Sequence, residues 1–138
     1  MNLSAFFAQN AKKIDKEKYV PSKRFLDGEN VLEWELICIT ALENNAIRDS
    51  CYKMVINPKR GEESRVLDTG LYQAKITARC VAFPNLEDME LQNSYGVRTS
   101  EDLIRTMLSP GEFENLSEKV LEINGFKSEN ELVDIAKN

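Results

Sequence analysis

The densest pattern of apolar positions in the chain lies between Asp68 and Pro84. Two neighbouring stripes run there at helical spacing, formed by Leu71, Ala74, Ala78 and Val81 and by Tyr72, Ile76, Cys80 and Phe83. A helix that is apolar nearly all round is usually buried in a core. The pattern therefore predicts a central helix, capped by Asp68 or Thr69 and ended by Pro84, which cannot continue the helical hydrogen-bond ladder. A short second helix is expected from Asn85 to near Gly96.

Nearer the N-terminus, two β-prone runs flank the turn-rich tetrapeptide Asp-Gly-Glu-Asn at residues 27–30. They span Tyr19–Leu26 and Val31–Ile39 and predict a β-hairpin. A four-residue loop would pair Phe25 with Leu32, Lys23 with Trp34, Pro21 with Leu36, Tyr19 with Cys38 and, on the other face, Arg24 with Glu33. Because Pro21 cannot donate to a ladder, the first strand is expected at an edge. Two strands alone are marginally stable, so the hairpin should pack on helices.

The segment between the hairpin and the central helix predicts one helix and one loop. Thr40 and Glu43 have the spacing of a capping box. Apolar residues then continue at helical spacing, namely Ile47, Cys51, Met54 and Val55. A helix is therefore expected from Ala41 to about Ile56, ended by the Asn-Pro pair that follows. Residues 57–67 are mostly charged and are interpreted as a mobile surface loop.

After Gly96 the chain predicts short antiparallel helices with tight connections. Thr99 or Ser100 opens one helix, whose buried face would be Leu103, Ile104, Met107 and Leu108. Ser109, Pro110 and Glu112 form a strong helix start, and that helix should end at Gly125. A last helix of about three turns is expected after a capping box at Ser128 and Glu131.

The first ten residues include the adjacent aromatic pair Phe6 and Phe7. Terminal segments are usually loose unless they are docked, so these rings either fold onto the core or wait for a partner. Folding onto the core is the favoured interpretation, because exposed aromatic pairs promote association. In the second case Phe6 and Phe7 are the candidate partner-binding residues. Residues 11–18 are interpreted as a solvated connector.

These elements together predict an α+β fold, mostly α-helical, with an N-terminal β-hairpin packed against about five or six helices. The 138 residues suggest a single domain, with residues 1–40 as the N-terminal segment and hairpin and residues 41–138 as the helical part. A chain of this length can bury about two-thirds of its unfolded surface, so it needs no metal or disulfide to fold. Its apolar stretches are too short for a membrane span or a signal peptide, so a cytoplasmic location is expected.

Composition argues against catalysis. Histidine is absent, which removes the commonest general base and the commonest metal ligand. Cys38, Cys51 and Cys80 are widely spaced among apolar residues, unlike zinc ligands, and are expected to be reduced and largely buried. We therefore expect no catalytic residues, no cofactor and no metal.

Charge is unevenly distributed along the chain, whose net charge is −5. Residues 1–84 carry 13 basic and 11 acidic side chains, a net of +2, whereas residues 85–138 carry 5 basic and 12 acidic side chains, a net of −7. An acidic helical half repels nucleic acid and is compatible with a basic partner, although it can equally be a solubilising surface. We expect neither a nucleic-acid nor a membrane partner.

Several segments, taken in order, resemble the XkdN-like tail assembly chaperones of tailed phages and defective prophages. They are residues 3–10 (LSAFFAQN), 22–25 (SKRF), 34–36 (WEL) with 39–40 (IT), 80–86 (CVAFPNL), 91–97 (LQNSYGV), 107–112 (MLSPGE) and 122–126 (EINGF). The resemblance implies a small α+β protein that binds the phage tape measure protein and keeps it soluble before tail tube assembly, in the host bacterial cytoplasm and outside the finished virion. The alternative is a generic cytoplasmic interaction or regulatory module without catalytic activity. Self-association is left open.

Overall fold

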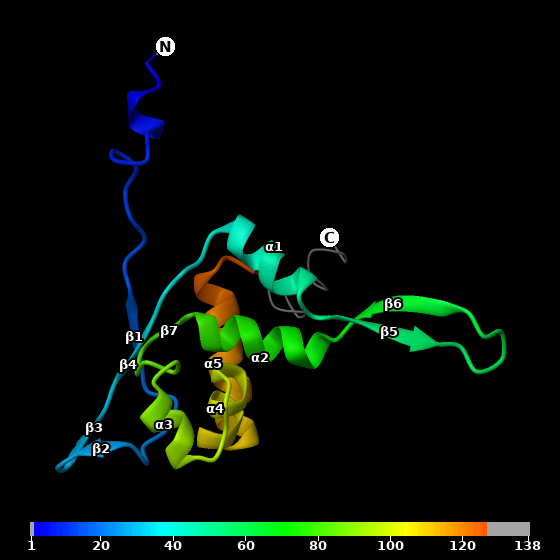
Figure 1. Ribbon diagram of the computed structural model, residues 1–138. Coiled ribbons are helices and arrows are strands. Elements are labelled where there is room, and N and C mark those ends of the chain that lie inside the picture. Colours follow the sequence, from blue (N-terminus) through cyan, green and yellow to red (C-terminus); the bar gives the residue numbers. More distant parts are fainter. Residues whose placement is uncertain (1, 127–138) are drawn as a thin grey trace, which may run out of the picture.

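The computed structural model describes residues 2–126 (Figure 1). Within that range the chain forms five α-helices, one 3-10 turn and seven short strands in three antiparallel sheets. Two segments extend away from the helices: the N-terminal residues and a hairpin made by β5 (Tyr52–Ile56) and β6 (Glu63–Leu67) (Figure 1). The helix predicted after Ser128 lies outside the described residues.

Helix α2 (Thr69–Arg79) is the central element, as predicted. Its N-cap is Asp68, whose carboxylate accepts a hydrogen bond from the Leu71 backbone N–H at 3.1 Å. The helix buries Ala74, Ile76, Thr77 and Ala78. It packs against α1 (Ala41–Asp49), α4 (Ser100–Met107), α5 (Pro110–Ile123) and β7 (Val81–Phe83). The apolar stripes thus correctly identified the helix around which the body forms.

The predicted end of this helix is wrong. The helix stops at Arg79, and β7 (Val81–Phe83) follows it directly. Residues 81–83 satisfy their backbone groups by pairing with β4 instead of continuing the helical ladder. A β-branched valine and a phenylalanine fit this pleated, half-buried position well. The next helix, α3 (Met89–Ser94), starts after the N-cap Asp88, four residues later than expected.

A three-stranded sheet joins three distant parts of the chain in the order β1–β4–β7. Its strands are β1 (Glu17–Tyr19), β4 (Trp34–Leu36) and β7. Trp34 and Leu36 of the middle strand are buried in the same core as the helices. The strands pack on helices, as predicted, and the first strand lies at an edge. That strand shares only Tyr19 with the predicted one, however, and Pro21 lies outside it.

The predicted hairpin register holds only at the tip. There β2 (Leu26–Asp27) pairs with β3 (Asn30–Val31), and the Leu32 N–H donates to the Phe25 carbonyl. Further down, Tyr19 faces Trp34, where Lys23 was expected. Residues 20–24 leave the ladder, and Pro21 and Ser22 are buried there. The predicted pairs of Lys23 with Trp34, Pro21 with Leu36, Tyr19 with Cys38 and Arg24 with Glu33 are therefore wrong.

Helix α1 (Ala41–Asp49) begins as predicted, with the Thr40 hydroxyl accepting from the Glu43 backbone N–H at 3.1 Å. It ends seven residues early. A second hairpin follows, in which β5 (Tyr52–Ile56) pairs with β6 (Glu63–Leu67). The predicted helix to Ile56 and the predicted loop over residues 57–67 are thus both corrected. Met54 and Val55 alternate on a strand instead of sharing a helix face.

The remaining helices match their predicted starts. Helix α4 (Ser100–Met107) is capped by Thr99. Helix α5 (Pro110–Ile123) opens with a complete capping box, in which Ser109 and Glu112 satisfy each other's backbone N–H groups. The α+β class is confirmed, but the expectation that strands occur only in an N-terminal hairpin is wrong, because small sheets are spread along the chain.

Candidate partner-binding surfaces

The N-terminal residues form an exposed arm, defined here as residues 2–16 (Figure 1). A single 3-10 turn (Ser4–Phe6) lies within it, and the Asn10 side-chain amide donates to the Ser4 carbonyl at 2.7 Å. The Phe6 side chain is 76% exposed and that of Phe7 is 50% exposed. The favoured interpretation that both rings pack on the core is therefore wrong.

The base of the arm is fixed to the body by one strand and by ion pairs. Strand β1 pairs with β4, and the Lys119 ammonium lies 3.0 Å from the Glu17 carboxylate. The hydrogen bond that Lys119 donates to the Glu17 carboxylate raises the pKa of Lys119 above its ordinary value. A longer pair at 3.9 Å joins Lys16 to Glu35. The arm thus leaves the body from a defined position.

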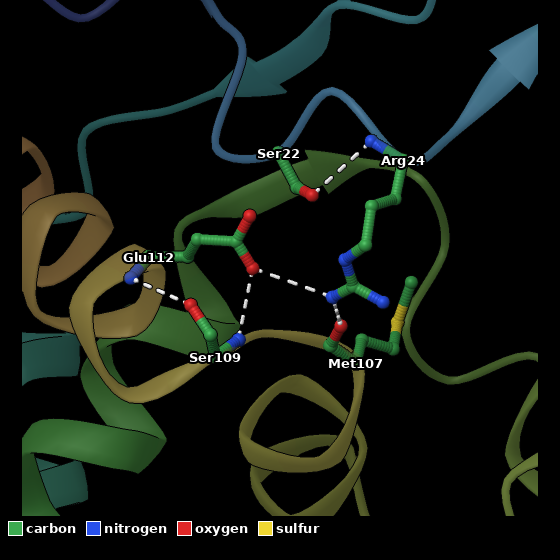
Figure 2. Close-up of polar contacts among 5 residues, drawn as sticks. All are labelled: Ser22, Arg24, Met107, Ser109 and Glu112. Atoms are coloured by element: carbon green, nitrogen blue, oxygen red, sulfur yellow. Dashed lines mark hydrogen bonds and ion pairs between the residues drawn. The ribbon is translucent and has the colours of Figure 1, made fainter.

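A polar junction just after β1 holds residues 20–25 against the helices (Figure 2). The Arg24 guanidinium donates to the Met107 carbonyl at the end of α4 and to the Glu112 carboxylate, 3.3 Å away. The same carboxylate accepts from the Ser109 backbone N–H at 2.9 Å. The Ser22 hydroxyl accepts from the backbone N–H of Arg24 at 3.3 Å. A cation at a helix C-terminus also complements the helix dipole.

These donors all stabilise the ionised form of Glu112. The backbone N–H of Ser109, then the Ser22 hydroxyl and the Arg24 guanidinium, lower the pKa of this carboxyl from 4.5 to about 2. Sequence reasoning missed the junction because Arg24 and Glu112 are 88 residues apart. The junction has a structural role: it couples the N-terminal segment to the connection between α4 and α5.

The β5–β6 hairpin, called the ribbon below, is a second apolar surface. It projects from the body on the side away from α3 (Figure 1). Its exposed apolar side chains include Met54 at 59% and Ile56 at 62% exposure, together with Val55 and Val66. The sequence stripes had assigned these residues to a helix face and a loop, so this surface was not predicted.

A cleft of about 650 Å³ lies between the end of α2, the segment around β7 and the start of α4. Its apolar lining includes Ile37, Ile47 and Leu86, and its rim carries charges of both signs. Arg79 on the rim is neutralised by Glu43, with two nitrogen–oxygen distances of 2.9 Å. Such a lining provides shape and apolar contact, and nothing in it resembles a set of catalytic groups.

The thiols and acidic groups of the described residues do not form a metal site. No group of three or more potential ligands comes together within residues 2–126. Cys51 and Cys80 are free and buried, as expected, whereas Cys38 is free and only half-buried. Burial raises the pKa of the Cys80 thiol. A raised thiol pKa makes that group less reactive.

Comparison with known proteins identifies the family. The profile of the family described as "Phage XkdN-like tail assembly chaperone protein, TAC" matches residues 3–137. In Bacillus subtilis strain 168, the uncharacterized protein YqbN is 30% identical over 99% of this chain and 93% of its own length. The phage-like element PBSX protein XkdN of the same strain is 28% identical, over 99% of this chain and 94% of its own.

The fold agrees with that assignment. The crystal structure of YqbN superposes with a TM-score of 0.76 at 25% identity, covering 92% of this chain and 98% of that one. The chain therefore belongs to the XkdN-like phage tail assembly chaperones, a non-catalytic family. Within residues 2–126, none of the helices is long and apolar enough to cross a membrane.

Proposed function

We propose that this tail assembly chaperone binds the tape measure protein of its phage or prophage and keeps it soluble until the tail tube assembles. The family assignment makes a tail protein the expected partner. The observation that supports a direct binding role is the exposed aromatic pair Phe6 and Phe7 on the N-terminal arm. Aromatic anchors contribute much of the binding energy at protein interfaces.

The position of the arm suits this role. Its base is held by the Lys119–Glu17 pair and by β1, from which the arm extends away from the helices (Figure 1). Residues 8–16, between the two phenylalanines and β1, are all exposed. An arm of this kind can follow an elongated client without disturbing the core. The client's apolar stripes must be covered before assembly and released afterwards, so several weak contacts serve better than one tight interface. Individual affinities in the micromolar range, about −8 kcal/mol, meet that need.

The protein acts in the host bacterial cytoplasm during assembly, folds as one domain, and does not remain in the finished virion. Self-association at the same apolar surfaces would compete with the client. Size-exclusion chromatography of the free protein and of the complex measures self-association. Immunoblotting of purified particles tests whether the protein is absent from the virion.

Coexpression with the tape measure protein of the same phage or prophage tests the proposal directly. The native chain should keep the client in the soluble fraction and copurify with it. The double variant Phe6→Ala/Phe7→Ala should fold but leave much more client in the pellet. A matched control is Leu26→Ala/Val31→Ala, which removes two exposed apolar side chains from the β2–β3 tip. If the native chain leaves the client fully insoluble at every ratio, the proposed function is wrong.

A further inference from the structure

The ribbon presents two different faces. In an antiparallel ladder, directly paired residues point to the same side, and alternate residues share a face. Tyr52, Met54 and Ile56 therefore lie on one face, where they pair with Leu67, Arg65 and Glu63 respectively. We call this the Met54 face. The opposite face carries Val55 and Val66 with the polar residues that pair with them.

The Met54 face has apolar side chains but little cover from the rest of the chain. The Arg65 guanidinium lies over the Tyr52 ring, 4.3 Å from its centroid, and so occupies one end of the face. Met54 and Ile56 remain more than half exposed. A two-stranded ribbon is marginally stable by itself and normally needs a further layer. Within the described residues, that layer is missing on this face.

The ribbon also has a charge opposite to that of the rest of the chain. Residues 52–67 include the basic Lys53, Lys59, Arg60 and Arg65 and the acidic Glu62 and Glu63, a net of +2. Since the whole chain has a net charge of −5, the remainder carries −7. An acidic partner segment is therefore repelled by the helices and attracted to the ribbon. Charge complementarity of this kind sets where and in which register a partner binds.

We propose that the Met54 face docks an amphipathic helix of the client whose apolar stripe is bordered by Asp and Glu side chains; this deepens, and rests on, the proposed function. Alternate strand residues are about 7 Å apart, and helix residues four positions apart are separated by about 6 Å along the axis. Met54 and Ile56 can therefore meet successive turns of one helical stripe. Arg65 lies on this same face, and Lys59 and Arg60 lie at the ribbon tip, where they can meet the acidic border of that helix. Lys53 points to the opposite face and pairs with Asp68 at 3.9 Å, and Glu63 is an acidic residue on the Met54 face.

Two synthetic helical peptides test the charge requirement against the full-length chaperone. They share one apolar stripe, bordered by Glu in the first and by Lys in the second. The Glu-bordered peptide should bind at least tenfold more tightly at low salt, and the difference should shrink as salt is raised. Equal affinity for both peptides, or preference for the Lys-bordered one, would overturn the proposed chemistry.

Paired variants test the location. Met54→Thr/Ile56→Thr removes the apolar contact while keeping residues that favour strands. It should weaken binding of the Glu-bordered peptide at least tenfold. Val55→Thr/Val66→Thr, on the opposite face, should change it less than twofold. An NMR shift map of the native chain with the same peptide should perturb residues of the Met54 face, and a map centred on the N-terminal arm or the cleft would refute the assignment even if a variant failed to fold.

Coexpression separates this inference from the proposed function. If the native chain solubilises the tape measure protein and the Met54→Thr/Ile56→Thr variant does so equally well, the ribbon is not a docking site but the chaperone function stands. If the native chain fails to solubilise the client, the proposed function itself fails. The expected result is native solubilisation with a several-fold loss in the ribbon variant and none in the opposite-face control.

Discussion

The body of the molecule, meaning the helices with the β1–β4–β7 sheet, and its two projecting segments carry the same kinds of apolar residue in opposite surroundings. In the body, side chains such as Leu36, Ile76 and Leu103 are fully removed from water. In the arm and the ribbon, Phe6 and Ile56 remain mostly exposed. Burial of apolar area stabilises a fold at about 25 cal/mol per Å². The exposed set contributes little of this term, so these residues add little to the stability of the fold.

The largest expected effect lies at the centre of the body. Trp34 is 2% exposed and stacks at a tilt against Phe25, with ring centroids 5.9 Å apart. Trp34→Ala should cost about 3–5 kcal/mol of unfolding free energy, because truncating a core aromatic leaves a cavity. Urea denaturation followed by circular dichroism measures it. A loss below about 1 kcal/mol would mean that the ring contributes little to the core, and that Trp34 does not differ in this respect from the exposed Phe6 and Ile56.

A buried pair of hydroxyl groups should make a smaller contribution to the stability of the body. Thr77 of α2 and Ser117 of α5 are both buried, with their hydroxyl oxygens 2.9 Å apart. Replacing one partner leaves the other unsatisfied, so Thr77→Val and Ser117→Ala should each cost about 1–3 kcal/mol. The double variant should lose less than the sum of the two, because it leaves neither hydroxyl orphaned. Strict additivity in this double-mutant cycle would show that the two groups do not interact.

The features that could be predicted from the sequence are those that depend on residues close together in the chain. The sequence predicts the N-caps Thr40 and Ser109 correctly, and for two other helices it offers the observed caps, Asp68 and Thr99, as one of two alternatives, because a cap depends on residues within one helical turn. The turn at the β2–β3 tip was also found from its local residues. These features involve only near neighbours in the chain.

The failures involve partners far away in sequence. Short apolar runs such as residues 52–56 and 81–83 fit a helix stripe or a strand equally well, and only pairing with β6 or β4 decides between them. The Arg24 junction depends on residues of α4 and α5. The exposure of Phe6 could not be read from its residue type, because an aromatic side chain suits a core and an interface equally.

A smaller effect is expected at the polar junction, and it should depend on pH. Because the pKa of Glu112 falls from 4.5 to about 2 on folding, its ionised form stabilises the folded state. That contribution is present above pH 4.5 and is lost as the pH falls toward 2. The native chain should therefore be more stable than Glu112→Gln near neutral pH, with the difference vanishing near about pH 2.

Unfolding free energies of both chains across this pH range provide the check. Asp102→Asn is a suitable control, since its exposed pair with Arg105 lies within one helix and should give only a small change. A difference between native and Glu112→Gln that stays constant from neutral to acidic pH would show that the junction does not hold this carboxylate ionised.

The smallest effect on stability is expected for the residues proposed to matter most for binding. Phe6→Ala/Phe7→Ala should change the unfolding free energy by no more than about 0.5 kcal/mol, because exposed side chains away from the core have little to lose. Thermal and urea unfolding of the free protein measure this. A variant that unfolds, or loses several kcal/mol, would mean that the rings pack on the protein's own core in solution. If stability is unchanged but the client is no longer kept soluble, the two rings act in binding and not in folding. The core around Trp34 would then be intact in both proteins.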